Sequence, residues 1–125
     1  MIAVLPGICE EVAFRGMLLY GLRRRYSVAG VAVVVGMVFG FFHFDMLRIV
    51  TTGTLGIVIT AVALLTGSIF PGIILHLGNN ALAVWLGTEG LPIEQAHPAI
   101  LGLAPVVVAV LVGILYRYRT PYPAE

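Results

Sequence analysis

Six polar side chains that interrupt the apolar stretches of this sequence are the best candidates for chemistry. They are Glu10, Glu11, Arg15, His43, His76 and Asn80. Ionisable groups inside apolar segments are costly to bury, so they usually face a cavity or one another. A carboxylate, two imidazoles and a carboxamide can together activate a water molecule and hold a developing oxyanion. The residue types therefore predict one shared site for acid–base chemistry.

The first group contains two neighbouring glutamates for which the sequence predicts different roles. Glu11 and Arg15 are four residues apart, so on a helix they share a face and can form an ion pair with a structural role. Glu10 is rotated by about 100° from Glu11, and no basic residue lies three or four positions after it. Such a carboxylate, held away from water, is a candidate general base. The alternative is a Glu10 at a helix end, stabilised by the helix dipole and interfacial water.

The second group lies in the apolar run over Ile69–Leu86. His76 and Asn80 are four residues apart, so on a helix both side chains point into the same space. A hydrogen-bonded contact between helices is the alternative to a functional role. His43 stands near the end of another apolar run, after Phe39. A single histidine in that position is more often an interfacial residue than a catalyst, so His43 alone carries no prediction.

Other kinds of site find little support in the sequence. Cys9 is the only cysteine, which excludes an internal disulfide and a thiolate zinc cluster. Ser68 falls in a predicted turn and has no convincing partners for a serine nucleophile. The H-E-x-x-H helix motif of soluble zinc proteases is absent. Seven basic and six acidic residues give a net charge of +1, so nothing favours binding of nucleic acid.

The elements that must hold these residues are predicted to be membrane helices. Of the 125 residues, 60% are hydrophobic and 10% are charged, against about 25% charged residues in ordinary soluble domains. A soluble domain of this size could not hide so much apolar surface. The apolar runs have lengths near those needed to cross hydrocarbon. We predict an all-α, polytopic transmembrane helical bundle of four to five membrane helices, forming one domain over residues 1–125: Gly7–Leu22, Val28–Phe44, Ile49–Leu65, Ile69–Leu86 and Ala99–Tyr116.

Small and charged residues indicate how these helices are arranged. Gly36 and Gly40 are four residues apart, which would let their helix approach a neighbour closely. The Thr66–Ser68 segment predicts a tight turn between two helices. By the positive-inside rule, Arg23–Arg25 and the polar tail 117–125 lie on the cytoplasmic side of the membrane.

Three short motifs carry a resemblance to a known family. Residues 10–15 read EEVAFR, residues 39–43 read FGFFH and residues 76–80 read HLGNN, which match EExxxR, FxxxH and HxxxN. Each motif alone is weak. In this order, and on successive hydrophobic helices, they resemble the CPBP family of intramembrane proteases, also called Abi or type II CAAX prenyl endopeptidases. The resemblance covers about Pro6 to Trp85.

The resemblance implies hydrolysis of a peptide bond inside the bilayer. Glu10 and His43 match the positions that activate water in the family. His76 and Asn80 match the positions that form the oxyanion site. The remaining motif positions, Glu11 and Arg15, are then supporting residues, in agreement with the ion pair that their spacing predicts.

The resemblance also implies a cofactor and partners. The family is often described as metalloproteases, and Glu10, His43 and His76 would supply three ligands to a catalytic Zn²⁺ with one position open. A metal-free glutamate mechanism is the alternative. The expected partners are membrane lipid and a peptide or prenylated protein substrate, in the cytoplasmic membrane of a prokaryote. The oligomeric state stays open.

Competing interpretations assign a different function to the same residues. The polar cluster could hold a partner peptide without turnover, as a membrane scaffold or a bacteriocin self-immunity protein would. A proton- or ion-coupled transporter would also bury Glu and His, but it predicts a continuous polar path, and Val28–Val38 offers none. Family members usually carry several more membrane helices ahead of the first motif. This leaves open whether residues 1–125 are a minimal core or lack upstream helices.

Overall fold

The computed structural model describes residues 4–44, 46–88, 113 and 116–117, and this part of the chain is helical with no strand. The elements are α1 (Val4–Glu11), η1 (Val12–Leu18), α2 (Leu19–Leu22), α3 (Val28–Phe41), α4 (Met46–Thr66) and α5 (Phe70–Thr88). The all-α prediction is confirmed for these residues. The predicted fifth helix, Ala99–Tyr116, and the polar tail 117–125 lie almost entirely outside the described residues.

Three predicted helix boundaries differ from the structure by three residues, and one of them affects a candidate residue. The first helix begins at Val4 rather than at the expected Gly7. The helix expected over Val28–Phe44 ends at Phe41, because the backbone then tightens into a turn. The His43 amide donates to the Gly40 carbonyl at 3.1 Å, and Phe44 has a φ of 51°. His43 therefore lies in the turn that follows α3. The next helix begins at Met46 rather than at the expected Ile49.

The first helix changes its winding where the charged residues begin. α1 continues without a break into η1, a π-helix, and then into α2. Along this run the buried positions recur every four residues, at Gly7, Glu11, Arg15 and Leu19. An α-helix has 3.6 residues per turn, so a four-residue repeat would drift around it. The wider π turn, with its i→i+5 pattern, offsets that drift and keeps both charged side chains on the inward face.

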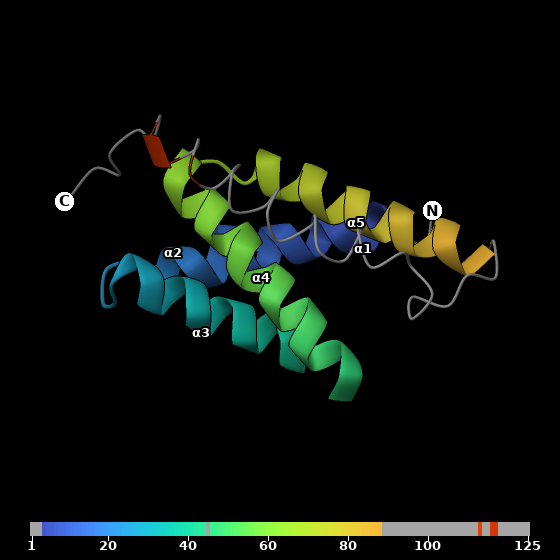
Figure 1. Cartoon of the computed structure of the whole chain (residues 1–125). Helices are drawn as coiled ribbons and strands as arrows, with labels where there is room; N and C mark the ends of the chain where they lie inside the picture. Colours follow the sequence, from blue (N-terminus) through green and yellow to red (C-terminus); the bar gives the residue numbers. More distant parts are fainter. Residues whose placement is uncertain (1–3, 45, 89–112, 114–115, 118–125) are drawn as a thin grey trace.

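α4 crosses α3 at very close range (Figure 1). A Cβ atom at Gly36 would lie 2.5 Å from the backbone nitrogen of Ile57, and one at Gly40 would lie 2.6 Å from the Ile49 carbonyl oxygen. Only glycine permits this approach of the two backbones. The close contact predicted from Gly36 and Gly40 is confirmed, and α4 is the neighbour.

α5 returns along the first helix after a tight turn. Gly67 ends α4 with a φ of +65°, a conformation that glycine adopts without a steric penalty. The predicted turn at Thr66–Ser68 is therefore confirmed. From there α5 packs against both α1 and α4 (Figure 1). This arrangement brings the face of α5 that carries His76 onto the glutamates of the first helix.

One of the described helices is long and apolar enough to cross a membrane. The qualifying segment is Ile49–Thr66 in α4, and α3 is apolar but shorter. The four to five spans predicted from hydropathy stay a prediction.

Candidate active site

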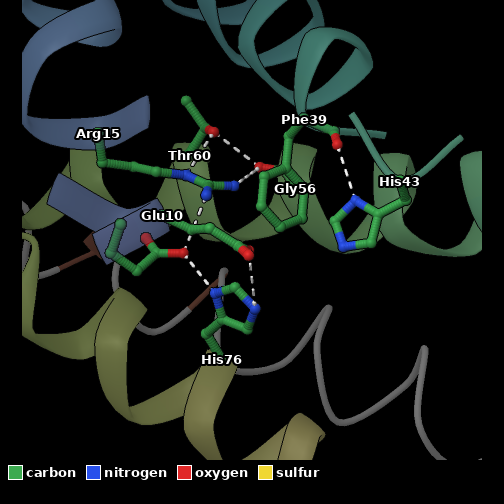
Figure 2. A network of polar contacts seen from close by, with 8 residues as sticks. Glu10, Arg15, Phe39, His43, Gly56, Thr60 and His76 are labelled. Atoms are coloured by element: carbon green, nitrogen blue, oxygen red, sulfur yellow. Dashed lines mark hydrogen bonds and ion pairs between the residues drawn. The ribbon is translucent and has the colours of Figure 1, made fainter. Parts of the chain in front are cut away.

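A buried polar network joins the first helix to α4 and α5 (Figure 2). Its four most enclosed side chains, Glu11, Arg15, Thr60 and His76, expose between 0% and 3% of their surface. Polar groups this deeply buried are costly unless they bind one another. The contacts within this network show how each group is satisfied.

The predicted ion pair between Glu11 and Arg15 is confirmed. Arg15 Nη1 donates to Glu11 Oε1 at 2.9 Å. The guanidinium makes two more bonds, both to α4, with Nη2 donating to the Gly56 carbonyl at 2.9 Å and Nε donating to Thr60 Oγ1 at 3.2 Å. Its Cζ atom also lies 4.6 Å from the centre of the Phe39 ring, within cation–π range. Arg15 is therefore fixed in position by three helices.

His76 lies between the two neighbouring glutamates, of which Figure 2 labels Glu10. Its Nδ1 atom is 2.9 Å from Glu11 Oε1, across 65 residues of sequence, and its Nε2 atom is 3.6 Å from Glu10 Oε2. Glu11 is fully buried, whereas the side chain of Glu10 is 32% exposed. The two carboxylates thus occupy different environments on opposite edges of one imidazole.

His43 reaches the same region through an aromatic side chain. Its Nδ1 atom is 3.0 Å from the carbonyl oxygen of Phe39. The Phe39 ring contacts both imidazoles edge-on, with centroid distances of 5.0 Å to His43 and 5.5 Å to His76. Within the described residues, the hydrogen bond of His43 is to this carbonyl and not to Glu10 or His76. The two histidines are therefore neighbours around one phenyl ring.

Asn80 lies one helical turn along α5 from His76 and faces the first helix. A Cβ atom at Gly7 would lie 3.6 Å from Asn80 Nδ2 and 3.9 Å from His76 Cγ. The shared face that the spacing of these two residues predicts is thus turned toward α1, where Gly7 gives them room. Glu10 and Glu11 are on the next turn of the same helix.

The buried carboxylate of Glu11 depends on a glycine of α5. A Cβ atom at Gly72 would lie 3.0 Å from Glu11 Oε2 and 2.8 Å from Ile59 Cγ2. Oε2 has no hydrogen-bond partner among the described residues, so nothing compensates if this oxygen is displaced. The contact at Gly72 sets where the Glu11 carboxylate can sit.

We expect Gly72→Ala to destabilise the protein by about 1–3 kcal/mol, the usual range for overpacking. We also expect it to displace Glu11 from His76. Gly78→Ala on the same helix is the matched control, since a Cβ there meets nothing within 4 Å. Thermal unfolding in detergent measures the stability of both variants. Equal stability of the two variants would contradict the tight contact at Gly72.

A metal centre is not assembled in the described arrangement. Glu10, His43 and His76 have the donor atoms that zinc prefers. Among the residues that the structure describes, however, no three His, Cys, Asp or Glu side chains lie close enough together to hold an ion. Glu10 and His76 face each other, and His43 stands apart beside Phe39. The Zn²⁺ that the resemblance implies at these residues stays a prediction.

Sequence reasoning missed three features of this network. Glu11 binds His76 as well as Arg15, and the anchoring groups Gly56 and Thr60 come from α4. No local sequence pattern predicts these contacts, because they join residues that are 41 to 65 positions apart. The one available signal is Thr60 itself, a hydroxyl in the middle of an apolar helix.

Comparison with known proteins agrees with the motifs. No curated protein and no solved structure gives a significant match to the chain. The family model described as type II CAAX prenyl endopeptidase Rce1-like matches residues 1–82, which hold every member of the polar network. Together with the apolar length of α4, this match indicates an integral membrane protein. The chain therefore belongs to the type II CAAX prenyl endopeptidase Rce1-like family, a family of proteases.

Proposed function

We propose that this protein is an intramembrane endopeptidase in which Glu10 activates the attacking water and His76 receives the developing charge. One observation carries the proposal, namely the position of His76 between a buried carboxylate and a partly exposed one. If Glu10 and His76 formed a purely structural pair, exposure of Glu10 to water would not strengthen their contact. An accessible carboxylate beside an anchored imidazole supplies a base and an electrophile in one place.

Glu10 acts as the general base in this proposal. Its side chain is 32% exposed, so water can reach the carboxylate, and within the part of the chain that the structure describes, His76 Nε2 lies 3.6 Å from it. His43 assists from beside Phe39. Because a carbonyl oxygen can only accept, the 3.0 Å contact with Phe39 requires a proton on His43 Nδ1. In the neutral ring, Nε2 is then an acceptor for a proton of the same water molecule.

His76 and Asn80 stabilise the oxyanion. Ionised Glu11 only accepts hydrogen bonds, so His76 Nδ1 donates to it and the ring orientation is fixed. A second proton on Nε2 makes His76 a cation. Nε2 and the Asn80 amide are the two donors that the oxyanion needs.

The reaction then balances with these groups alone. Water adds to the carbonyl carbon of the substrate and gives a proton to Glu10, and the carbonyl oxygen becomes the oxyanion bound by His76 and Asn80. Collapse of this tetrahedral intermediate breaks the C–N bond. Glu10 returns the proton to the departing nitrogen, and the other hydrogen of the water stays on the new carboxyl group, so the products are a carboxylic acid and an amine. The substrate class we propose is a membrane-associated peptide, including prenylated CAAX ends.

The test is cleavage of labelled peptides by the full 125-residue chain in lipid nanodiscs. One peptide set carries a prenylated CAAX end and the other is unmodified. We expect a new carboxyl terminus that incorporates one oxygen atom from ¹⁸O-labelled water. Stable retention of intact peptide, with no new terminus, would instead identify a membrane scaffold.

Zinc dependence has a separate test. Because the described arrangement does not group Glu10, His43 and His76 into one ligand set, we expect a chelator titration to leave the cleavage rate unchanged. Loss of cleavage that added Zn²⁺ restores would contradict this expectation. It would mean that His43 joins Glu10 and His76 around a metal ion.

A further inference from the structure

α4 carries none of the motif residues, yet it supplies a fully buried hydroxyl to the polar network. Thr60 exposes 0% of its surface, and it stands among apolar neighbours such as Ile59 and Val62. A valine would fill the same volume without a polar atom to satisfy. The hydroxyl therefore needs an explanation beyond packing.

The contacts of Thr60 place it at the origin of a chain of hydrogen bonds (Figure 2). Its Oγ1 donates to the Gly56 carbonyl at 2.7 Å and accepts from Arg15 Nε at 3.2 Å. The same carbonyl also accepts from Arg15 Nη2 at 2.9 Å. One edge of the guanidinium is thus held by two oxygens of α4. Its planar fork then has a fixed direction.

The opposite edge of this guanidinium is connected to His76 through Glu11. Arg15 Nη1 and His76 Nδ1 are both 2.9 Å from the same oxygen, Glu11 Oε1. The direction of the guanidinium therefore sets the position of Oε1, and Oε1 sets the orientation of the imidazole. Thr60 is connected to His76 through three consecutive hydrogen bonds.

We propose that Thr60 is a positioning residue, whose hydroxyl orients His76 through Arg15 and Glu11. This proposal rests on the proposed function, in which His76 Nε2 meets the oxyanion. Loss of the hydroxyl removes one of the two oxygens that hold this edge of the guanidinium, which loosens Glu11 Oε1. The imidazole then loses its fixed orientation, although no group that touches the substrate is removed.

The experiment compares Thr60→Val with Thr60→Ser in the full chain. Thr60→Val keeps the shape and removes the hydroxyl, whereas Thr60→Ser keeps the hydroxyl. Thr54→Val is the matched control, because Thr54 Oγ1 donates to the Val50 carbonyl at 2.7 Å as Thr60 does to Gly56, but Thr54 is exposed. Thr60→Ala is a second hydroxyl-free variant in case the first does not fold.

Two readouts are needed. We expect Thr60→Val to lower kcat by about 10–100-fold with KM unchanged, the effect of a misplaced catalytic group. In ¹⁵N-histidine-labelled protein, the Nδ1 resonance of His76 should shift in the same variant. Thr60→Ser should restore both, and Thr54→Val should change neither.

The outcomes separate this proposal from the proposed function. An unchanged His76 resonance in folded Thr60→Val or Thr60→Ala overturns the positioning role, whatever happens to stability. If the wild type cleaves no peptide but the resonance shifts and Thr60→Ser restores it, Thr60 positions His76 and the protease proposal fails. If cleavage falls without any change at His76, Thr60 acts on stability alone and the proposal is wrong.

Discussion

Glu10→Gln is expected to lower the rate of peptide cleavage by about 10²–10⁴-fold, the usual contribution of a general base. Glutamine has nearly the same shape but cannot take a proton from water. The stability of the fold should hardly change, because Glu10 is 32% exposed and its distance of 3.6 Å to His76 Nε2 is too long for a hydrogen bond. Single-turnover cleavage in nanodiscs measures the rate, and thermal unfolding verifies the fold.

Glu11→Gln is the matched control for this prediction. The two glutamates are adjacent in sequence, but Glu11 is fully buried and binds both Arg15 and His76. Its replacement should destabilise the fold, whereas Glu10→Gln should affect cleavage alone. Cleavage by Glu10→Gln at the wild-type rate would remove Glu10 from the mechanism.

Arg15→Met is expected to destabilise the protein by about 3–5 kcal/mol, the cost of breaking a buried ion pair by removing one partner. Methionine fills much of the space but leaves Glu11 as a buried carboxylate without its cation. It also removes the donors to the Gly56 carbonyl and Thr60 Oγ1. Denaturant titration in mixed micelles gives the free energy of unfolding.

A double-mutant cycle with Glu11→Gln sharpens this prediction. Each single variant removes the Glu11–Arg15 ion pair and leaves its other member buried, so the double variant should be less destabilised than the sum of the two. Thr54→Val provides a baseline on α4, because its hydroxyl lies on an exposed position outside the network. Strictly additive losses would show that Glu11 and Arg15 do not depend on each other.

The helical periodicity determined the local part of this site. The ion pair of Glu11 with Arg15 needs only a four-residue spacing, which the helix converts into a shared face. The same spacing put His76 and Asn80 on one face of α5. The composition and the motif order likewise predicted the all-α class and the family. These properties depend on residues close in sequence, so they can be predicted without a structure.

The tertiary structure decided how those faces meet. The approach of α4 to α3 depends on backbone contacts at Gly36 and Gly40, and it carries Thr60 to the guanidinium of Arg15. Spacing on one helix says nothing about the angle at which another crosses it, so the sequence did not predict the role of α4. The π turn of η1 was also unforeseen, since it is favoured by the fit of the inward face rather than by residue type.

The sequence by itself therefore determined the helices, the candidate groups and the family. Only the tertiary structure decided which of those groups contact one another. Glu11 joins Arg15 through a local contact and His76 through a contact that spans 65 residues. The first follows from helix geometry. The second exists because α5 packs on α1 where Gly72 leaves room for a carboxylate, a result of three-dimensional packing that no single segment encodes.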